Sequence, residues 1–152
     1  MRAQIPERPG SPFPIEVAGI VTKGFGRGSR ELGFPTANIS PTDIPSQLDR
    51  VGVYFGYAMV RQEVFSMVMS LGYNPYYKNV EKSLEIYIVH EFKSDFYGES
   101  MRAIVCGWLR PELDYTTRDA LIQDIRKDVT IALTALEQPA YAQFKEHPIF
   151  KR

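Results

Sequence analysis

The stretch that decides the fold is residues 51–73, which read VGVYFGYAMVRQEVFSMVMSLGY. Val, Phe, Tyr and Met dominate it, and apolar residues occur on both faces of an alternating pattern, as in strands that are covered on both sides. The three residues at 61–63, Arg-Gln-Glu, interrupt this pattern over a gap short enough for a hairpin turn. We therefore predict two adjacent antiparallel strands, Val51–Val60 and Val64–Tyr73.

Three further stretches of the same composition predict strands at Ile15–Val21, Leu84–Phe92 and Arg102–Leu109. Turn-like residues such as Asp95–Gly98 separate them, and no helical pattern lies between them. Five or six strands with close turns indicate a mainly β, antiparallel sheet, and such sheets commonly close into a small barrel. One face of the strands would fill the barrel, so the other face must be covered by another element.

The covering element is predicted to be a helix over Arg118–Glu137. Its apolar residues recur at three- and four-residue spacing and form one face: Leu121, Ile125, Val129, Ala132 and Leu136. Thr116 or Thr117 can cap its start, and Pro139 ends the pattern. A second short helix is predicted from Pro139 to Lys145.

Composition predicts one domain over residues 15–152, preceded by an extended, proline-containing tail at 1–14. The 18 basic and 18 acidic residues balance, which gives no sign of a nucleic-acid partner. No apolar stretch approaches the roughly 18 residues of a membrane helix. A single cysteine, Cys106, indicates a reducing compartment. We expect a monomer in the cytoplasm, with organelle targeting left open.

A glycine-rich segment runs from Gly19 to Gly33, with five glycines in fifteen residues directly after a predicted strand. Glycine lets a ligand approach the backbone amides, and Lys23, Arg27 and Arg30 add positive charge. The segment would suit a phosphate chain, although it matches neither a Walker A loop nor a dinucleotide fingerprint. The alternative is a flexible basic loop.

Thr36 and Asn38 lie two residues apart, so in an extended stretch their side chains point to the same side. A hydroxyl and an amide oxygen are hard ligands that suit Mg²⁺, which needs few protein ligands because it keeps waters and bridges to phosphates. The alternative is a turn in which both side chains bond the local backbone.

Glu85 alternates with apolar residues and shares a strand face with Tyr87 and Val89. A carboxylate on a face that looks buried is costly unless it is paired or used, and a general base would sit on such a rigid element. The alternatives are an exposed strand end, or a buried ion pair with Lys78 or Lys82.

The order and spacing of these segments resemble the eukaryotic, monofunctional riboflavin kinases (flavokinases) over roughly two-thirds of the chain. The motifs that carry the resemblance are Gly-x-Val-x-x-Gly-x-Gly-x-Gly at 19–28, Gly-Phe-Pro-Thr-Ala-Asn at 33–38, Gly-Val-Tyr-Phe-Gly at 52–56, Asn-Pro-Tyr-Tyr-Lys-Asn at 74–79, Leu-Glu at 84–85, Asp-Phe-Tyr-Gly-Glu at 95–99 and Leu-Arg-Pro-Glu at 109–112. Pro-Thr-Ala-Asn is the most specific of them.

The resemblance implies a six-stranded antiparallel Greek-key barrel with a C-terminal helix. It also implies transfer of the ATP γ-phosphoryl group to the ribityl 5′-hydroxyl of riboflavin, which gives FMN and ADP. A divalent ion is implied as cofactor, Mg²⁺ first and Zn²⁺ or another ion as the alternative, with ATP as co-substrate. The implied roles are ATP binding by Gly24, Phe25, Gly26, Arg27, Gly28, Arg30, Thr36 and Asn38, metal binding by Thr36 and Asn38, general base catalysis by Glu85, and flavin binding by Arg110, Leu113 and Tyr115.

Three other readings of the sequence compete with a riboflavin kinase. A bifunctional enzyme that also makes FAD would carry an N-terminal nucleotidyltransferase domain with paired histidines, whereas only about fourteen residues precede the barrel here and His90 and His147 are far apart. A flavin- or nucleotide-binding barrel without catalysis would need neither Glu85 nor the Thr36/Asn38 pair. The third reading is a structural β-domain.

Overall fold

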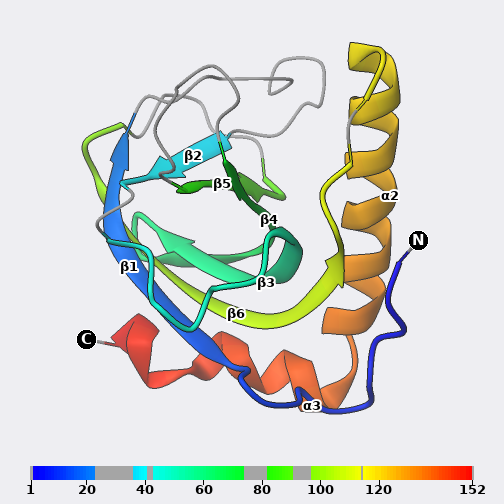
Figure 1. The fold of residues 1–152 in the computed structure, drawn as a ribbon. Helices are drawn as coiled ribbons and strands as arrows, with labels where there is room; N and C mark the ends of the chain where they lie inside the picture. Colours follow the sequence, from blue (N-terminus) through cyan, green and yellow to red (C-terminus); the bar gives the residue numbers. More distant parts are fainter. Residues whose placement is uncertain are drawn as a thin grey trace.

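The chain forms a barrel of strands with a long helix packed on its outside (Figure 1). The computed structural model describes residues 2–22, 36–40, 43–73, 82–90, 97–113 and 115–151. The predicted phosphate segment at 24–30 and the Asn-Pro-Tyr-Tyr-Lys-Asn motif at 74–79 lie outside these ranges. The elements are β1 (Ile15–Thr22), β2 (Thr36–Ile39), β3 (Gly52–Val60), β4 (Glu63–Tyr73), β5 (Lys82–Ile88), β6 (Ser100–Arg110), α2 (Arg118–Leu136), α3 (Pro139–Ala142) and two 3₁₀ turns, Gln143–Glu146 and Pro148–Lys151.

The six strands close in the order β1-β2-β5-β4-β3-β6, and every neighbouring pair is antiparallel. Strands β3, β4 and β5 follow one another as neighbours, and β6 then returns to lie beside β3. Three consecutive strands with a fourth beside the first make a Greek key. The predicted six-stranded antiparallel barrel with a C-terminal helix is thereby confirmed.

The hairpin predicted from residues 51–73 joins β3 to β4 with a two-residue turn. Arg61 and Gln62 have φ angles of 51° and 68°, and Val60 pairs with Glu63 across the turn. Positive φ at both central residues gives the turn a twist that matches the twist of the flanking strands. This local geometry fixes the register of the whole hairpin, which runs to Gly52 paired with Leu71.

Two strand predictions need correction. The alternating pattern gave no strand at Thr36–Ile39, which is β2, because four residues are too few to display a period. The strand predicted at Leu84–Phe92 ends at Ile88. There the N–H of His90 donates to the carbonyl of Ile88 at 2.9 Å, a tight turn that takes the chain out of the ladder.

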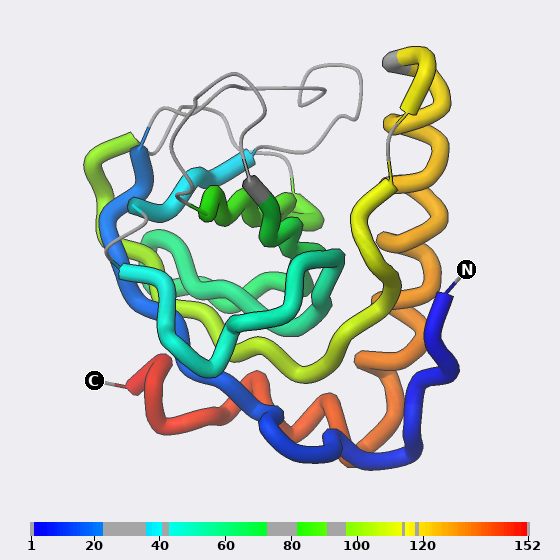
Figure 2. Tube along the Cα trace, in the orientation of Figure 1, coloured from blue at the N-terminus to red at the C-terminus, as the bar shows by residue number. Residues whose placement is uncertain are grey.

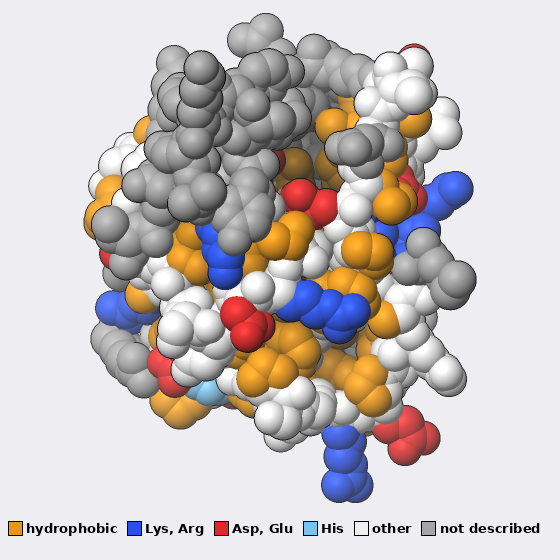
Figure 3. All heavy atoms as spheres, viewed as in Figure 1, with side chains coloured by type: hydrophobic (Ala, Val, Ile, Leu, Met, Phe, Trp, Pro, Cys, Tyr) orange, Lys and Arg blue, Asp and Glu red, His pale blue; other side chains and the backbone are white. Residues whose placement is uncertain are grey.

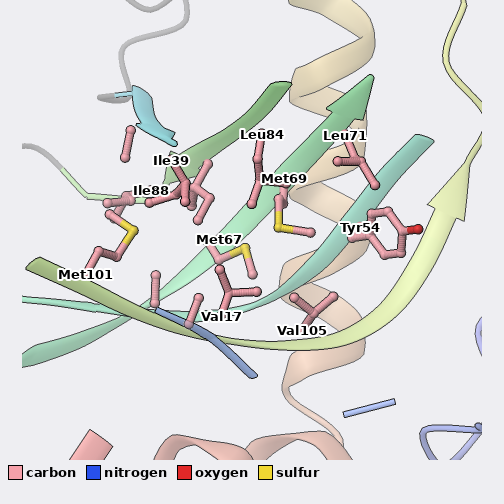
Figure 4. Packing of buried hydrophobic residues seen from close by; sticks show 14 of the residues in the cluster. Val17, Ile39, Tyr54, Met67, Met69, Leu71, Leu84, Ile88, Met101 and Val105 are labelled. Carbon is pink, nitrogen blue, oxygen red and sulfur yellow. The ribbon is translucent and has the colours of Figure 1, made fainter. Parts of the chain in front are cut away.

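The alternation within the strands separates two hydrophobic layers. Figure 4 shows the first, where side chains such as Met67, Met69 and Leu84 point into the barrel. The second lies between the outer face of the barrel and α2. It contains Phe55 and Tyr57 from β3 and, from α2, the residues Ile122, Ile125, Val129, Ala132, Ala135 and Leu136. The helix therefore covers the outer face as predicted, ending at Leu136 rather than Glu137, and its first turn is capped by Thr117, whose Oγ1 accepts from the N–H of Ala120 at 3.1 Å.

The segment ahead of β1 lies along α2 and then passes beneath the barrel (Figure 2). The N–H of Ala3 donates to the carbonyl of Leu109 at 2.6 Å, and the hydroxyl of Tyr141 donates to the carbonyl of Pro6 at 2.7 Å. Residues 2–14 form no helix or strand, yet these bonds attach them to β6 and α3. Within the described parts of the chain, no helix has the length and apolar character needed to cross a membrane.

Candidate active site

The pairing of β2 with β5 brings three predicted site residues onto one surface. Asn38 is the direct cross-strand partner of Glu85, and Thr36 is the partner of Tyr87. Their neighbours Ala37, Leu84 and Ile86 belong to the barrel interior, so by alternation the polar side chains point to the outside of the barrel. The Cβ atoms of directly opposed residues lie about 5 Å apart, so the side chains of Asn38 and Glu85 can contact the same ligand.

Thr36 and Asn38 are almost fully buried, with 6% and 8% of their surface exposed. They lie in a strand that pairs with β1 on one side and β5 on the other, which excludes the alternative of a local turn. The hydroxyl Oγ1 of Thr36 has no hydrogen-bond partner among the residues that the structure describes. A buried hydroxyl without a partner is rare, because its desolvation is not compensated. Its unused lone pairs fit the oxygen ligands expected of a divalent-ion site.

Glu85 is buried as well, with 8% of its surface exposed, which rules out the alternative of an exposed strand end. Its Oε2 accepts a hydrogen bond from the hydroxyl of Tyr87 at 3.0 Å. Lys82 lies three positions away on β5 and therefore on the other face, and its ammonium group donates to the carbonyl of Leu48 at 3.4 Å. The other suggested ion-pair partner, Lys78, lies outside the described residues. The carboxylate is thus held in place by a phenol on its own strand.

A second carboxylate reaches this surface from the segment after β6. Ser70 pairs with Glu85 across β4 and β5, and its Oγ donates to Oε1 of Glu112 at 3.1 Å. Gly72, on the same face of β4, leaves the space that the carboxylate occupies, because a Cβ there would lie 2.3 Å from both carboxylate oxygens. Ser70 and Gly72 therefore form a seat for Glu112 next to Glu85.

Arg110 ends β6 opposite Val53, whose side chain faces α2, and Arg110 therefore points toward the helix. Only 3% of its surface is exposed. Its Nε and Nη2 donate to the Asp128 carboxylate at 3.0 and 2.8 Å. Burial opposes the charge on Arg110, but the hydrogen bond and charge of Asp128 outweigh it and the pKa of the guanidinium is raised.

Tyr115 and Leu113 occupy different environments at the far end of the same segment. The hydroxyl of Tyr115 donates to Oδ2 of Asp124 on α2. Burial would raise the pKa of Asp124, but the bonds from Tyr115 and Arg2 outweigh burial and the pKa is lowered. Leu113 leaves 47% of its surface exposed. The surface between barrel and helix is hollowed in Figure 3, with hydrophobic and acidic side chains inside the hollow.

The described residues therefore divide the predicted site into two parts. Thr36, Asn38 and Glu85 come together on the barrel, whereas Arg110 and Tyr115 are bonded to α2. Direct contact of Arg110, Leu113 and Tyr115 with a flavin stays a prediction, as does phosphate binding at 24–30. Within the described ranges, no group of three or more His, Cys, Asp or Glu side chains could hold a metal ion.

Some residues at the site escaped the prediction from sequence. Tyr87 had a signal, since it shares the face of Glu85 two residues away. Asp128 had one too, because a carboxylate three residues after Ile125 falls on the buried stripe of the helix. Arg2, whose guanidinium contacts Asp124 and Asp128, had none, because those contacts span more than 120 positions of sequence.

Comparisons with known proteins identify the family of the chain. The family model described as "Flavokinase: Riboflavin kinase" matches residues 11–136. The chain is 41% identical over 171 residues to the riboflavin kinase of Scheffersomyces stipitis, a match that covers 93% of this chain and 96% of that protein. It is 47% identical over 138 residues to a bifunctional riboflavin kinase/FMN phosphatase of Arabidopsis thaliana, covering 89% of this chain but 36% of the plant protein.

A solved structure gives the same result. The crystal structure of riboflavin kinase from Trypanosoma brucei superposes with a TM-score of 0.72 at 28% identity, over 94% of this chain and 92% of that one. The family model covers most of the chain, and these relatives match nearly its whole length, so the chain belongs to the flavokinase family, the riboflavin kinases.

Proposed function

We propose that the protein transfers the γ-phosphoryl group of ATP to the ribityl 5′-hydroxyl of riboflavin and releases FMN and ADP. Membership of the flavokinase family supports the substrates. One observation in the fold supports the chemistry: the register of β2 and β5 sets Asn38 directly opposite Glu85. The amide oxygen of Asn38 suits a metal ion bound to phosphate, and the carboxylate of Glu85 suits the hydroxyl of riboflavin. Phosphoryl transfer requires these two groups to lie side by side, as they do here.

Glu85 is proposed as the general base. A carboxylate within hydrogen-bond reach of the attacking hydroxyl can orient it and accept its proton as the bond to phosphorus forms. The bond from Tyr87 at 3.0 Å occupies one side of Oε2 and fixes the orientation of the group. A base on the middle of a strand is also held more rigidly than one on a loop, which favours attack in line with the leaving group.

Thr36 and Asn38 are proposed to hold the divalent ion. The Oγ1 of Thr36, which none of the described residues contacts by a hydrogen bond, supports this assignment, since a ligand would satisfy it. When bound there with ATP, Mg²⁺ would neutralise charge on the phosphate oxygens. Zn²⁺ or another divalent ion remains the alternative.

The two substrates are proposed to be held by different segments of the chain. Residues 24–30, with Gly24, Gly26 and Gly28, would hold the ATP phosphates through backbone amides and Arg27 or Arg30. The exposed side chain of Leu113 offers apolar surface for the flavin ring. Arg110 and Tyr115, whose polar ends are bonded to α2, would shape the flavin side by holding that segment.

The experiment is to incubate the protein with riboflavin and Mg-ATP and to measure FMN and FAD separately by chromatography. FMN alone supports the proposal. FAD would support a bifunctional enzyme, and the absence of both would favour a barrel that binds without catalysis.

Glu85→Gln tests the mechanism. We expect riboflavin and ATP binding to persist while turnover falls by at least about a hundredfold, within the range for loss of a general base. The matched control is Glu137→Gln, which makes the same substitution at an exposed position after α2 and should keep full turnover. Near-normal turnover in Glu85→Gln would remove Glu85 from the mechanism without affecting the assignment of the substrates.

A further inference from the structure

Four charged side chains meet where the N-terminal segment, the end of β6 and α2 come together. Arg2 and Arg110 supply the two positive charges, and Asp124 and Asp128 supply the two negative ones. We call these four residues the charge cluster. Asp128 accepts from both guanidinium groups, from Nε of Arg2 at 3.0 Å and from Arg110 at 2.8 to 3.1 Å. The cluster therefore joins three segments that are far apart in sequence.

Arg2 completes the charge balance of the cluster. Without it, Arg110 would face two carboxylates, and the set would carry one net negative charge. The side chain of Asp128 is fully buried and that of Asp124 is 17% exposed, so solvent screens this imbalance poorly. Nη2 of Arg2 also donates to both the side chain and the carbonyl of Asp124, at 2.6 and 3.0 Å. One planar guanidinium thus holds two successive turns of α2.

The carboxylates of the charge cluster also contact both ends of the segment 110–115, at Arg110 and at Tyr115. At the start of this segment Arg110 donates hydrogen bonds to Asp128. At its end the hydroxyl of Tyr115 donates to Asp124, one helical turn away from Asp128. Between these two anchors Glu112 leaves the helix side and contacts Ser70 on β4, next to Glu85. The exposed Leu113 follows it directly. A shift of either anchor would move this wall of the site relative to the proposed base.

We propose that Arg2 is a positioning residue for riboflavin, acting through Asp124 and Asp128 on the segment from Arg110 to Tyr115. This inference rests on the proposed function and extends the acceptor side of the site to the N-terminal segment. Arg2 touches neither Glu85 nor Thr36 and Asn38 by any contact in the described structure, so its effect should fall on the flavin side and spare the nucleotide side.

The test is steady-state kinetics of the full chain and of Arg2→Ala with both substrates varied. We expect the KM for riboflavin to rise by about tenfold or more, the scale of a lost positioning contact, while the KM for ATP stays within about twofold. The matched control is Arg8→Ala, which removes an exposed arginine from the same segment and should change neither constant. Arg2→Lys keeps the charge but not the planar fork, and should lie between the wild type and Arg2→Ala.

A double variant separates positioning from general damage. Arg2→Ala with Asp124→Asn restores a neutral cluster and keeps an acceptor for Tyr115, so the riboflavin KM should recover at least in part. An unchanged riboflavin KM in Arg2→Ala would overturn the inference, and so would equal losses for both substrates with no recovery in the double variant. An inactive wild-type protein would instead overturn the proposed function, and the two failures are therefore distinct.

Discussion

Asp128→Asn should be the most destabilising single charge removal on α2. The carboxylate is fully buried and faces two guanidinium groups, of which Arg110 is itself 3% exposed. The amide that replaces it is nearly the same size, so no cavity forms and the change isolates the charge. Arg110 would keep one carboxylate, Asp124 at 3.5 Å, and would otherwise be a buried cation without its main partner.

The expected magnitude follows from the burial of the pair. Removing one partner of a buried ion pair costs about 3 to 5 kcal/mol, because the other charge stays desolvated. Because Arg110 keeps its contact with Asp124, we expect Asp128→Asn to lower the free energy of unfolding by about 3 kcal/mol, the lower end of this range. For a protein of this size about 2 to 4 °C of melting temperature corresponds to each kcal/mol, so the Tm should fall by about 6 to 12 °C.

Urea unfolding followed by circular dichroism measures this difference directly, with Asp119→Asn as control. Asp119 is an exposed acid in the first turn of the same helix, where the interaction of its charge with the helix dipole is worth less than about 1 kcal/mol. If Asp128→Asn lowered the free energy of unfolding no more than Asp119→Asn does, the charge cluster would not stabilise the packing of the N-terminal segment and β6 on α2. The positioning argument for Arg2 would then lose its basis.

Four further predictions each concern a single polar or titratable group. Thr36→Val replaces an unpartnered buried hydroxyl by a methyl group, so it should raise the stability of the ligand-free protein by about 1 kcal/mol in thermal unfolding while it weakens Mg-ATP binding in calorimetry. Asn38→Ala should also weaken Mg-ATP binding, and an unchanged metal dependence would refute the metal assignment. The pKa of Asp124 is lower in the folded protein than its unfolded value of about 4. The ionised carboxylate therefore stabilises the fold above about pH 4, and this stabilisation is lost as the pH falls through the folded pKa. Asp124→Asn should make the free energy of unfolding less dependent on pH in this acid range. Burial raises the pKa of Cys106 to about 12, so a thiol reagent should react with it only after unfolding.

The barrel and its helix could be predicted from the sequence because both depend on local alternation. The apolar residues of β3 fall on two faces, as at Phe55 and Tyr57 outside and Tyr54 inside, and that pattern survives in the structure. The individual site residues could also be proposed one at a time, since a hydroxyl, an amide or a buried carboxylate is recognisable by its type and its neighbours in sequence.

Their arrangement could not be predicted in this way, because it depends on pairings between distant segments. Strand β2 is too short to show a period, yet its register alone sets Asn38 opposite Glu85. The seat for Glu112 needs the absence of a side chain at Gly72, a residue 40 positions away that lies within the predicted strand Val64–Tyr73. The bonds of Arg2 to α2 depend on the final position of a segment that looked like a free tail.

The polar groups on the outside of the barrel differ in whether the protein itself satisfies them. In the charge cluster, Asp128 accepts from two guanidinium groups and the charges sum to zero, as expected of groups whose task is to hold segments together. On β2, the buried hydroxyl of Thr36 lacks a partner within the described parts of the chain, although β2 is paired on both sides. An apolar residue at this position would avoid that cost, which supports the proposal that a ligand satisfies the hydroxyl. In the proposed mechanism, the charge cluster therefore positions one wall of the site, and β2 supplies the group that binds the ligand.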